Sequence, residues 1–288
     1  MKIKNSIWIR RACSALLIFM TVCILIYIMQ DGMMFYNVND QGSRKFLQGL
    51  PQYHDVMFTD QNGVTHHGMK YRASNEKKPL VIYFGGNGEV SYRNLRMHEV
   101  LNQWQYFAGY SYLFVDYRGY GLNSGRPHYL NMYEQSLAVF DYAASLQNVD
   151  SNRIVVMGYS LGTGSAVYLA ANRPVAGLIL IAPFANGYDL YNNVLPIFFG
   201  PMRLLVRQKF PSDKYAPHVT CPVLIIASRK DELIPFSSSQ RLSKLFSGNV
   251  DFMVLNNARH NDIFQVREVF NRVQSFLKLP LNTSDKEY

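Results

Sequence analysis

The sequence predicts an α/β fold built on a mostly parallel central sheet with helices on both faces. From about Tyr53 onward, short apolar runs alternate with helical stretches, the pattern of β-α-β units joined by right-handed crossovers. The apolar runs are nearly continuous, as expected of strands that are buried on both faces. The chain has 288 residues, 48% of them apolar, which is enough for one such domain with a large core.

The predicted elements follow one another in a regular order. Strands are expected at 55–59, 66–72, 80–84, 112–115, 153–157, 178–181, 223–227 and 251–255. Helices are expected at 91–106, 133–147, 163–172, 235–246 and 262–277, and Asp262 is expected to cap the last of them. The segment 184–220 breaks the alternation with prolines and apolar residues, and we expect it to be a lid. Residues 282–288 are expected to form a tail.

The N-terminus differs from the rest of the chain. Residues 12–29 carry no charge and follow a cluster of basic residues, and 18 residues are about the length of a membrane-spanning helix. A cleaved signal peptide is the alternative, but the run ends without an A-x-A-like cleavage site. We expect residues 1–31 to form a cytoplasmic tip and a transmembrane anchor, and 32–288 to form the α/β domain. The positive-inside rule places that domain on the periplasmic, extracytoplasmic or lumenal side.

Charge and cysteine content narrow the class of protein. The net charge of +9 suits an anionic membrane surface. Nucleic-acid binding is not indicated, because the sequence has no basic stripe interleaved with aromatic residues. Only Cys221 lies outside the apolar N-terminal segment, so we expect no disulfide within the domain. His66 and His67 lack partners at metal-ligand spacing and are interpreted as part of a strand.

The most informative motif is Gly158-Tyr159-Ser160-Leu161-Gly162. It follows an apolar run and opens a stretch of small residues with helical character. A G-x-S-x-G in that strand-to-helix setting is the nucleophile elbow of serine hydrolases. The turn leaves no room for a side chain at its flanks, which explains Gly158 and Gly162. The motif therefore predicts Ser160 as a nucleophile at the carboxyl end of a central strand.

A serine hydroxyl needs a general base, usually an imidazole held by a carboxylate. After this type of elbow, the acid and then the histidine follow at the ends of later strands. Asp231 and His260 each come just after a predicted strand, and His260 is the only histidine beyond Asp231. Glu232 and Asp251 are alternative acids, but Glu232 should point elsewhere and Asp251 begins a strand at the wrong end. The predicted catalytic residues are therefore Ser160, Asp231 and His260.

An acyl-transfer site also needs two N–H donors for the developing oxyanion. The amide of Leu161, directly after the nucleophile, is the first predicted donor. The second is expected from the glycine-rich stretch 85–88, where we assign the amide of Asn87. A plain glycine-rich turn is the alternative interpretation, whereas a phosphate loop is not indicated because no G-K-[ST] follows.

The motifs occur in a recognisable order along the chain. They are Phe84-Gly85-Gly86-Asn87-Gly88, Asp116-Tyr117-Arg118-Gly119-Tyr120-Gly121, Ser124-Gly125, the elbow, Ala182-Pro183-Phe184, Cys221-Pro222-Val223-Leu224, Asp231 and His260-Asn261-Asp262. This series resembles the α/β-hydrolase superfamily, and most closely its Bem46-like branch of membrane-anchored serine hydrolases. The resemblance implies that fold, an ester, thioester or lipid substrate, no metal and no cofactor. The resemblance also implies that Asp116 and Arg118 are structural residues that shape the turn after the fourth strand.

The chain departs from this family at two positions. The family usually has His-Gly where this chain has Gly85-Gly86, and it tends to have a glycine where Ser228 stands. We expect a membrane-anchored serine esterase, thioesterase or lipase-like enzyme that works through an acyl-enzyme. Two alternatives stay open, namely a serine peptidase of the prolyl-oligopeptidase type and a non-catalytic binding protein. The peptidase is less favoured, because the chain has no room for the large gating domain of that type. The apolar and basic lid residues indicate either an acyl-chain pocket near an anionic bilayer or a simple cover over the core.

Overall fold

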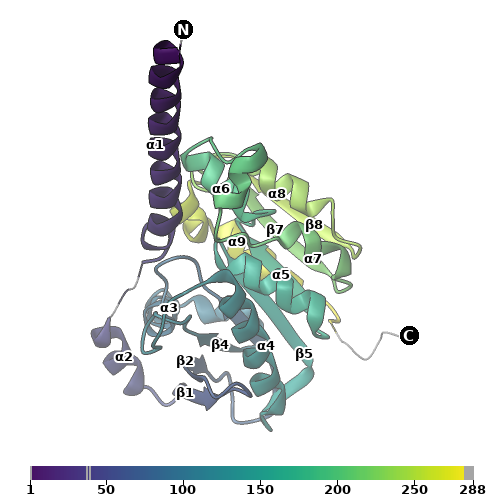
Figure 1. Cartoon of the computed structure of the whole chain (residues 1–288). Helices are drawn as coiled ribbons and strands as arrows, with labels where there is room; N and C mark the ends of the chain where they lie inside the picture. Colours follow the sequence, from purple (N-terminus) through teal and green to yellow (C-terminus); the bar gives the residue numbers. More distant parts are fainter. Residues whose placement is uncertain (1, 37, 39, 282–288) are drawn as a thin grey trace.

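The computed structural model describes residues 2–36, 38 and 40–281, and its centre is an eight-stranded sheet (Figure 1). The strands are β1 (Tyr53–Thr59), β2 (Thr65–Tyr71), β3 (Lys78–Phe84), β4 (Ser111–Val115), β5 (Val149–Tyr159), β6 (Gly177–Ile181), β7 (Val223–Ser228) and β8 (Val250–Leu255). Their order in space is β1-β2-β4-β3-β5-β6-β7-β8. β2 pairs antiparallel with β1 and with β4, and the remaining neighbours are parallel. The mostly parallel sheet predicted from the sequence is confirmed.

Helices cover both faces of this sheet. The α-helices are α1 (Lys2–Met34), α2 (Gln41–Gln48), α3 (Ser91–Val100), α4 (Tyr129–Ser145), α5 (Gly162–Asn172), α6 (Gly187–Val194), α7 (Ser212–Tyr215), α8 (Phe236–Ser243) and α9 (Arg267–Leu277). Short 3-10 helices are η1 (Gln103–Phe107), η2 (Gly200–Leu205), η3 (Ala216–His218) and η4 (His260–Gln265). α4 and α5 pack together against β5, whereas α3, η1 and α9 form a second group on the other face (Figure 1).

Two predicted helices are interrupted. The helix expected over 91–106 divides into α3 and η1 because Asn102 adopts a left-handed φ of 50° between them. The helix expected over 262–277 divides into η4 and α9. The prediction that Asp262 caps this last helix is wrong, because the N-cap of α9 is Val266. Asp262 lies instead in the first turn of η4.

The central strand β5 is longer than the sequence pattern indicated. It runs to Tyr159, so that regular sheet structure reaches the residue directly before Ser160. β3 on one side and β6 on the other hold it in parallel register, with Gly158 opposite Phe84 and Leu180. Neighbouring parallel strands end at one edge of the sheet, and the loops that follow them can therefore meet there.

The N-terminal helix α1 projects away from the domain (Figure 1), and its end contacts η2 and Tyr191 of α6. Its stretch Trp8–Gly32 is long and apolar enough to cross a membrane. The segment predicted as a lid, 184–220, folds between β6 and β7 into α6, η2, α7 and η3. Met1 and the predicted tail, 282–288, lie outside the described residues.

Candidate active site

The predicted elbow is a sharp turn between β5 and α5. Ser160 has a φ of 49°, in the left-handed region that a residue with a side chain rarely adopts. Its amide donates to the carbonyl oxygen of Ile181 at 2.9 Å, which ties the turn to β6. A Cβ on Gly158 would come within 2.8 Å of Ala166 Cβ, and one on Gly162 within 2.0 Å of Phe84 O. Close packing of strand, turn and helix is therefore what requires glycine at both flanks.

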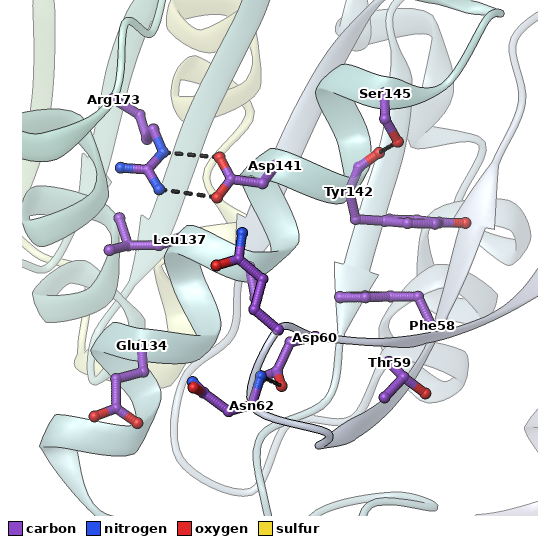
Figure 2. A pocket seen from close by; sticks show the side chains of 12 residues that line it. Phe58, Thr59, Asp60, Asn62, Glu134, Leu137, Asp141, Tyr142, Ser145 and Arg173 are labelled. Atoms are coloured by element: carbon purple, nitrogen blue, oxygen red, sulfur yellow. Dashed lines mark hydrogen bonds and ion pairs between the residues drawn. The ribbon is translucent and has the colours of Figure 1, made fainter.

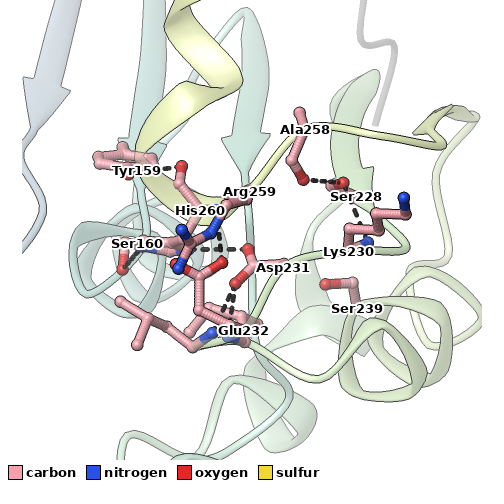
Figure 3. A network of polar contacts seen from close by, with 12 residues as sticks. Tyr159, Ser160, Ser228, Lys230, Asp231, Glu232, Ser239, Ala258, Arg259 and His260 are labelled. Atoms are coloured by element: carbon pink, nitrogen blue, oxygen red, sulfur yellow. Dashed lines mark hydrogen bonds and ion pairs between the residues drawn. The ribbon is translucent and has the colours of Figure 1, made fainter.

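Ser160, His260 and Asp231 meet at the carboxyl edge of the sheet (Figure 3). His260 Nε2 lies 2.9 Å from Ser160 Oγ, and His260 Nδ1 lies 2.7 Å from Asp231 Oδ2. The side chains of His260 and Asp231 are 4% and 2% exposed, so bulk water does not weaken their interaction. The structure thus brings together the three residues that the sequence predicted, in the geometry that lets an imidazole accept a serine proton.

The acid loop after β7 holds Asp231 toward the histidine. Its second oxygen, Oδ1, accepts hydrogen bonds from the backbone amides of Leu233 and Ile234 at 2.9 and 2.8 Å. Two donors on one carboxylate oxygen leave the other free for His260 Nδ1, and they fix the rotation of the side chain.

The two alternative acids do not contact the imidazole. Glu232 Oε2 accepts from the backbone amide of His260 at 3.1 Å, and Oε1 accepts from Arg259 at 3.2 Å. The hydrogen bond from the His260 backbone lowers the pKa of Glu232 below its ordinary value. Asp251 pairs with Arg272 at 2.6 Å, on the helix that follows the histidine loop. The Glu232 carboxylate therefore supports His260 by bonding the backbone amide of His260.

Two residues next to the triad support it in ways that the sequence reasoning missed. The Tyr159 ring stacks on the His260 imidazole with centroids 5.2 Å apart, and its hydroxyl donates to the His260 carbonyl at 3.1 Å. Ser228, where the family tends to have glycine, donates its hydroxyl to the carbonyl of Ala258 (Figure 3). The end of β7 is thereby tied to the loop that carries His260. The aromatic residue inside the elbow motif was the available signal for the first of these contacts.

The predicted oxyanion donors lie in two different loops. Leu161 follows the nucleophile, and Asn87 lies in the loop after β3. Within residues 2–36, 38 and 40–281, neither backbone N–H donates to a protein acceptor. A Cβ on Gly86 would lie 3.5 Å from Ser160 Cβ, so the loop passes directly beside the nucleophile. Both amides are therefore available to a ligand.

Glu89 organises this loop. The family usually has a histidine in the loop, at the position of Gly85. A Cβ on Gly85 would lie 2.5 Å from Phe114 Cζ and 3.0 Å from Glu89, which leaves no room for a larger residue. Glu89 Oε2 accepts from the amide of Gly86 at 2.7 Å and from the hydroxyl of Tyr83 at 2.8 Å. Burial raises the pKa of Glu89 above its ordinary value. The sequence reasoning noted the missing histidine but not this carboxylate three residues after Gly86.

The side chain of Asn87 joins the loop to the end of α1 and to Tyr36 just after it. Its Nδ2 donates to Met34 O at 2.5 Å, and its Oδ1 accepts from the Tyr36 amide at 3.1 Å and from the Tyr120 hydroxyl at 2.7 Å. We call these contacts the Asn87 clamp. No pattern in the sequence linked this loop to the N-terminal helix.

Asp116 takes part in the fold around the loop, as the resemblance implied. Its Oδ1 accepts from the Ser91 amide at 2.6 Å, and its Oδ2 accepts from the Ser91 hydroxyl at 3.0 Å, which satisfies the start of α3. Burial raises the pKa of Asp116 to about 7. Gly121 has a φ of 55°, and a Cβ there would lie 2.2 Å from Asp116 Oδ2. The turn after β4 is built around this carboxyl group.

Two surface cavities lie apart from the triad. One, of about 440 Å³, lies between α4 and the end of β1, where Phe58 stacks on Tyr142 and Arg173 pairs with Asp141 (Figure 2). The other, of about 620 Å³, lies among α6, η2, α7 and α8. Across the described residues, no group of three or more histidine, cysteine, aspartate and glutamate side chains is arranged to hold a metal ion.

Comparisons with known proteins agree with the fold. The sequence profile of the family described as serine aminopeptidase, S33 (Hydrolase_4) matches residues 75–212. The uncharacterized protein Rv2307c of Mycobacterium tuberculosis is 31% identical over 231 residues, which cover 79% of this chain and 80% of that protein. Lysophosphatidylserine lipase ABHD12 of Danio rerio is 28% identical over 230 residues, covering 70% of this chain and 59% of the lipase.

Solved structures show the same architecture. The Pyrococcus furiosus esterase Pf2001 has a TM-score of 0.67 at 22% identity, over 85% of this chain and 98% of the esterase. The acetyl xylan esterase from Paenibacillus sp. R4 has a TM-score of 0.64 at 17% identity, over 86% and 98% of the two chains. Identities this low carry the fold alone. Together with the sequence relatives, they show that the chain has the α/β-hydrolase fold and is similar to proteins described as hydrolases.

Proposed function

We propose that the chain is a membrane-anchored serine hydrolase of the Bem46-like branch that cleaves a carboxylic ester, thioester or lipid acyl bond. The observation that carries this proposal is the continuous hydrogen-bonded series from Ser160 Oγ through His260 to Asp231. A buried imidazole with a carboxylate on one nitrogen and a hydroxyl on the other is arranged to activate that hydroxyl.

The chemistry proceeds in two halves. Ser160 Oγ attacks the substrate carbonyl while His260 Nε2 takes the hydroxyl proton, and the amides of Leu161 and Asn87 stabilise the oxyanion. The imidazolium gives the proton to the leaving alcohol or thiol, and an acyl-enzyme remains on Ser160. Water then attacks the acyl-enzyme with His260 as the base, which releases the acid and restores Ser160. Asp231 orients His260 and stabilises its positive charge throughout.

The membrane assignment rests on α1. We assign residues 1–31 to a cytoplasmic tip and a transmembrane anchor, and 32–288 to a hydrolase domain with a lid at 184–220. The apolar stretch Trp8–Gly32 supports the anchor. The rest of the described chain buries none of its most apolar window. The basic residues among 2–11 favour a cytoplasmic N-terminus by the positive-inside rule, and the hydrolase domain is then assigned to the opposite side.

Labelling with a fluorophosphonate probe tests the nucleophile. We expect full-length protein in detergent to be labelled, and Ser160→Ala to lose the label completely because no oxygen remains to attack phosphorus. Ser151→Ala, at an exposed position of the same strand, is the matched control and should keep full labelling. Unchanged labelling of Ser160→Ala would show that the nucleophile is assigned wrongly. Absent labelling of the folded wild-type chain would favour a non-catalytic binding protein.

A serine aminopeptidase is the second candidate function, because the matching family profile carries that description. The two functions separate on substrates. A set of p-nitrophenyl esters of increasing acyl length and a set of aminoacyl p-nitroanilides would be compared by kcat/KM on the same preparation. We expect the esters to be cleaved and the anilides to be inert, and the reverse order would establish the peptidase.

A further inference from the structure

The lid carries large apolar side chains that face away from the domain. They are Val194 and Leu195 at the end of α6, Phe199 before η2, Leu204 in η2, and Leu233 in the neighbouring acid loop. Leu204 and Val194 are 81% and 78% exposed. Asn193 joins the two parts of this surface, because its Nδ2 donates to the Leu233 carbonyl at 3.1 Å. We call this surface the lid face. Several exposed large apolar side chains within one short region are typical of a surface that binds another apolar phase or a partner.

The lid face adjoins the end of the N-terminal helix. Gln30 Nε2 donates to Leu205 O at 2.6 Å, and Gln30 Oε1 accepts from the Arg207 amide at 3.0 Å. Asp31 pairs with Arg207 at 3.0 Å. The Arg207 guanidinium also lies over the Tyr27 ring, 5.0 Å from its centroid. The residue next to the exposed Leu204 is therefore bonded directly to the point where the apolar part of α1 ends.

These contacts fix the height of the lid relative to a bilayer. The uncharged residues 12–29 of α1 rise over about 27 Å, close to the hydrocarbon thickness of about 30 Å. Gln30 and Asp31 then lie at the level of the headgroups, together with the lid residues that bind them. Tyr191 of α6 also contacts the end of α1. A lid held at this level lies close to the leaflet from which α1 emerges.

We propose that the lid face is a membrane-docking surface, buried in the headgroup and upper acyl region of the leaflet in which α1 ends. Apolar side chains at this depth gain the free energy of leaving water. Arg203 and Lys209, on either side of the anchor contact, add attraction for anionic headgroups. The proposal rests on the proposed anchor, because only a membrane-spanning α1 sets this height. It goes further in assigning the lid, together with the acid loop that Asn193 bonds, to the lipid surface.

Site-specific fluorescence tests the proposal on the full chain. Cys13 and Cys23 are replaced by serine, and Cys221 stays because it is buried from labelling reagents. A single cysteine that carries the polarity-sensitive dye NBD is then placed at Leu204→Cys, Phe19→Cys in α1, or Met57→Cys in β1. Met57 is 67% exposed and lies at the far edge of the sheet, which makes it the matched control for Leu204. Leu195→Cys is a second lid position in case Leu204→Cys does not fold.

The labelled proteins are reconstituted in vesicles of phosphatidylcholine and phosphatidylglycerol. We expect nitroxide-bearing lipids to quench the dye at Leu204 and Phe19 at least twofold more than at Met57, and aqueous iodide to quench mainly at Met57. If both lid positions are quenched by iodide while Phe19 is quenched only by lipid, the docking proposal is overturned and the anchor stands. If Phe19 is quenched by iodide, the anchor itself is wrong.

Discussion

The two halves of the candidate site are supported in different ways. Ser160, Asp231 and His260 each follow a strand of the parallel sheet, and the loops that carry them are bonded to one another. The oxyanion loop after β3 is instead held by its own Glu89 and by the Asn87 clamp. The first half is set by the sheet, whereas the second depends on the Glu89 carboxylate and on the chain at the end of α1.

This difference indicates which changes the site can tolerate. In the triad half, the sheet keeps the geometry and a substitution removes a chemical group. In the oxyanion half, a substitution outside the reacting atoms shifts the backbone amides that bind the oxyanion. Such donors act through position, so small displacements lower the rate without removing any reacting group.

The largest effect is expected in the triad half. Asp231→Asn should lower kcat about 10³- to 10⁴-fold, because an amide cannot hold the imidazole in the tautomer that accepts the serine proton. The hydrolysis of a p-nitrophenyl ester by the full-length variant measures this loss. Glu232→Gln is the matched control at the next position. Since the Glu232 carboxylate bonds the His260 backbone amide and the Arg259 side chain rather than the imidazole, kcat of this variant should fall less than about tenfold.

The opposite order of these two variants would make Glu232 the acid. It would also show that the acid loop changes conformation when substrate binds. The comparison between the two halves would then fail, because the triad would no longer be set by the strand ends alone.

An intermediate effect is expected at Glu89. Glu89→Ala removes the acceptor for the Gly86 amide and the Tyr83 hydroxyl, so kcat should fall about 10- to 100-fold, or about 1.4–2.7 kcal/mol, with KM little changed. Glu89→Gln keeps an acceptor oxygen at the same place and should recover most of the rate. The fluorophosphonate labelling of Ser160 provides a second readout of both variants.

A purely structural role for Glu89 would give a different result. Both variants would then lower the melting temperature in parallel with the rate, and the glutamine would not restore kcat. That outcome would remove the carboxylate from the account of the oxyanion loop.

The smallest effect on rate is expected at Asp116, which lies one step further from the chemistry. Its pKa is about 7 in the folded chain, above the ordinary value of 3.8, because burial disfavours the charge. Between pH 4 and 7 the unfolded chain therefore binds fewer protons than the folded chain, and stability falls as pH rises. Asp116→Asn should make the melting temperature less dependent on pH over this range, while activity at pH 7 stays within about twofold of the wild-type value. If the melting temperature of the variant changes with pH as steeply as that of the wild-type chain, another group is responsible for the pH dependence.

The sequence was a good guide wherever one local rule decides the structure. The apolar runs located the strands, and the elbow with the later aspartate and histidine led to residues that do meet in space. The helix predicted over 91–106 failed because nothing in the apolar pattern signals the left-handed Asn102. Asp262 was misplaced as a cap because a 3-10 turn precedes α9, and such a turn shares the composition of a helix start.

Contacts between distant segments could not be read from the chain. Glu89 was overlooked because a carboxylate after a glycine-rich loop has no meaning until Tyr83 and Phe114 close around it. Two contacts of the Asn87 clamp join residues more than 50 positions apart and use backbone atoms of Met34 and Tyr36, which every residue possesses. Such pairings depend on the packing of complete elements, and no residue type at either end announces them.

The Asn87 clamp has a consequence for how this protein is prepared. Membrane-anchored enzymes are commonly made soluble by deleting the anchor, on the assumption that the helix serves only as a tether. Here a deletion that removes residues up to Tyr36 would also remove the carbonyl and the amide that hold the Asn87 side chain. The shortened protein could fold, bind probes at Ser160 and still turn over slowly. A low rate measured on such a preparation would describe the deletion rather than the enzyme, so the full-length chain is the form in which substrates should be compared.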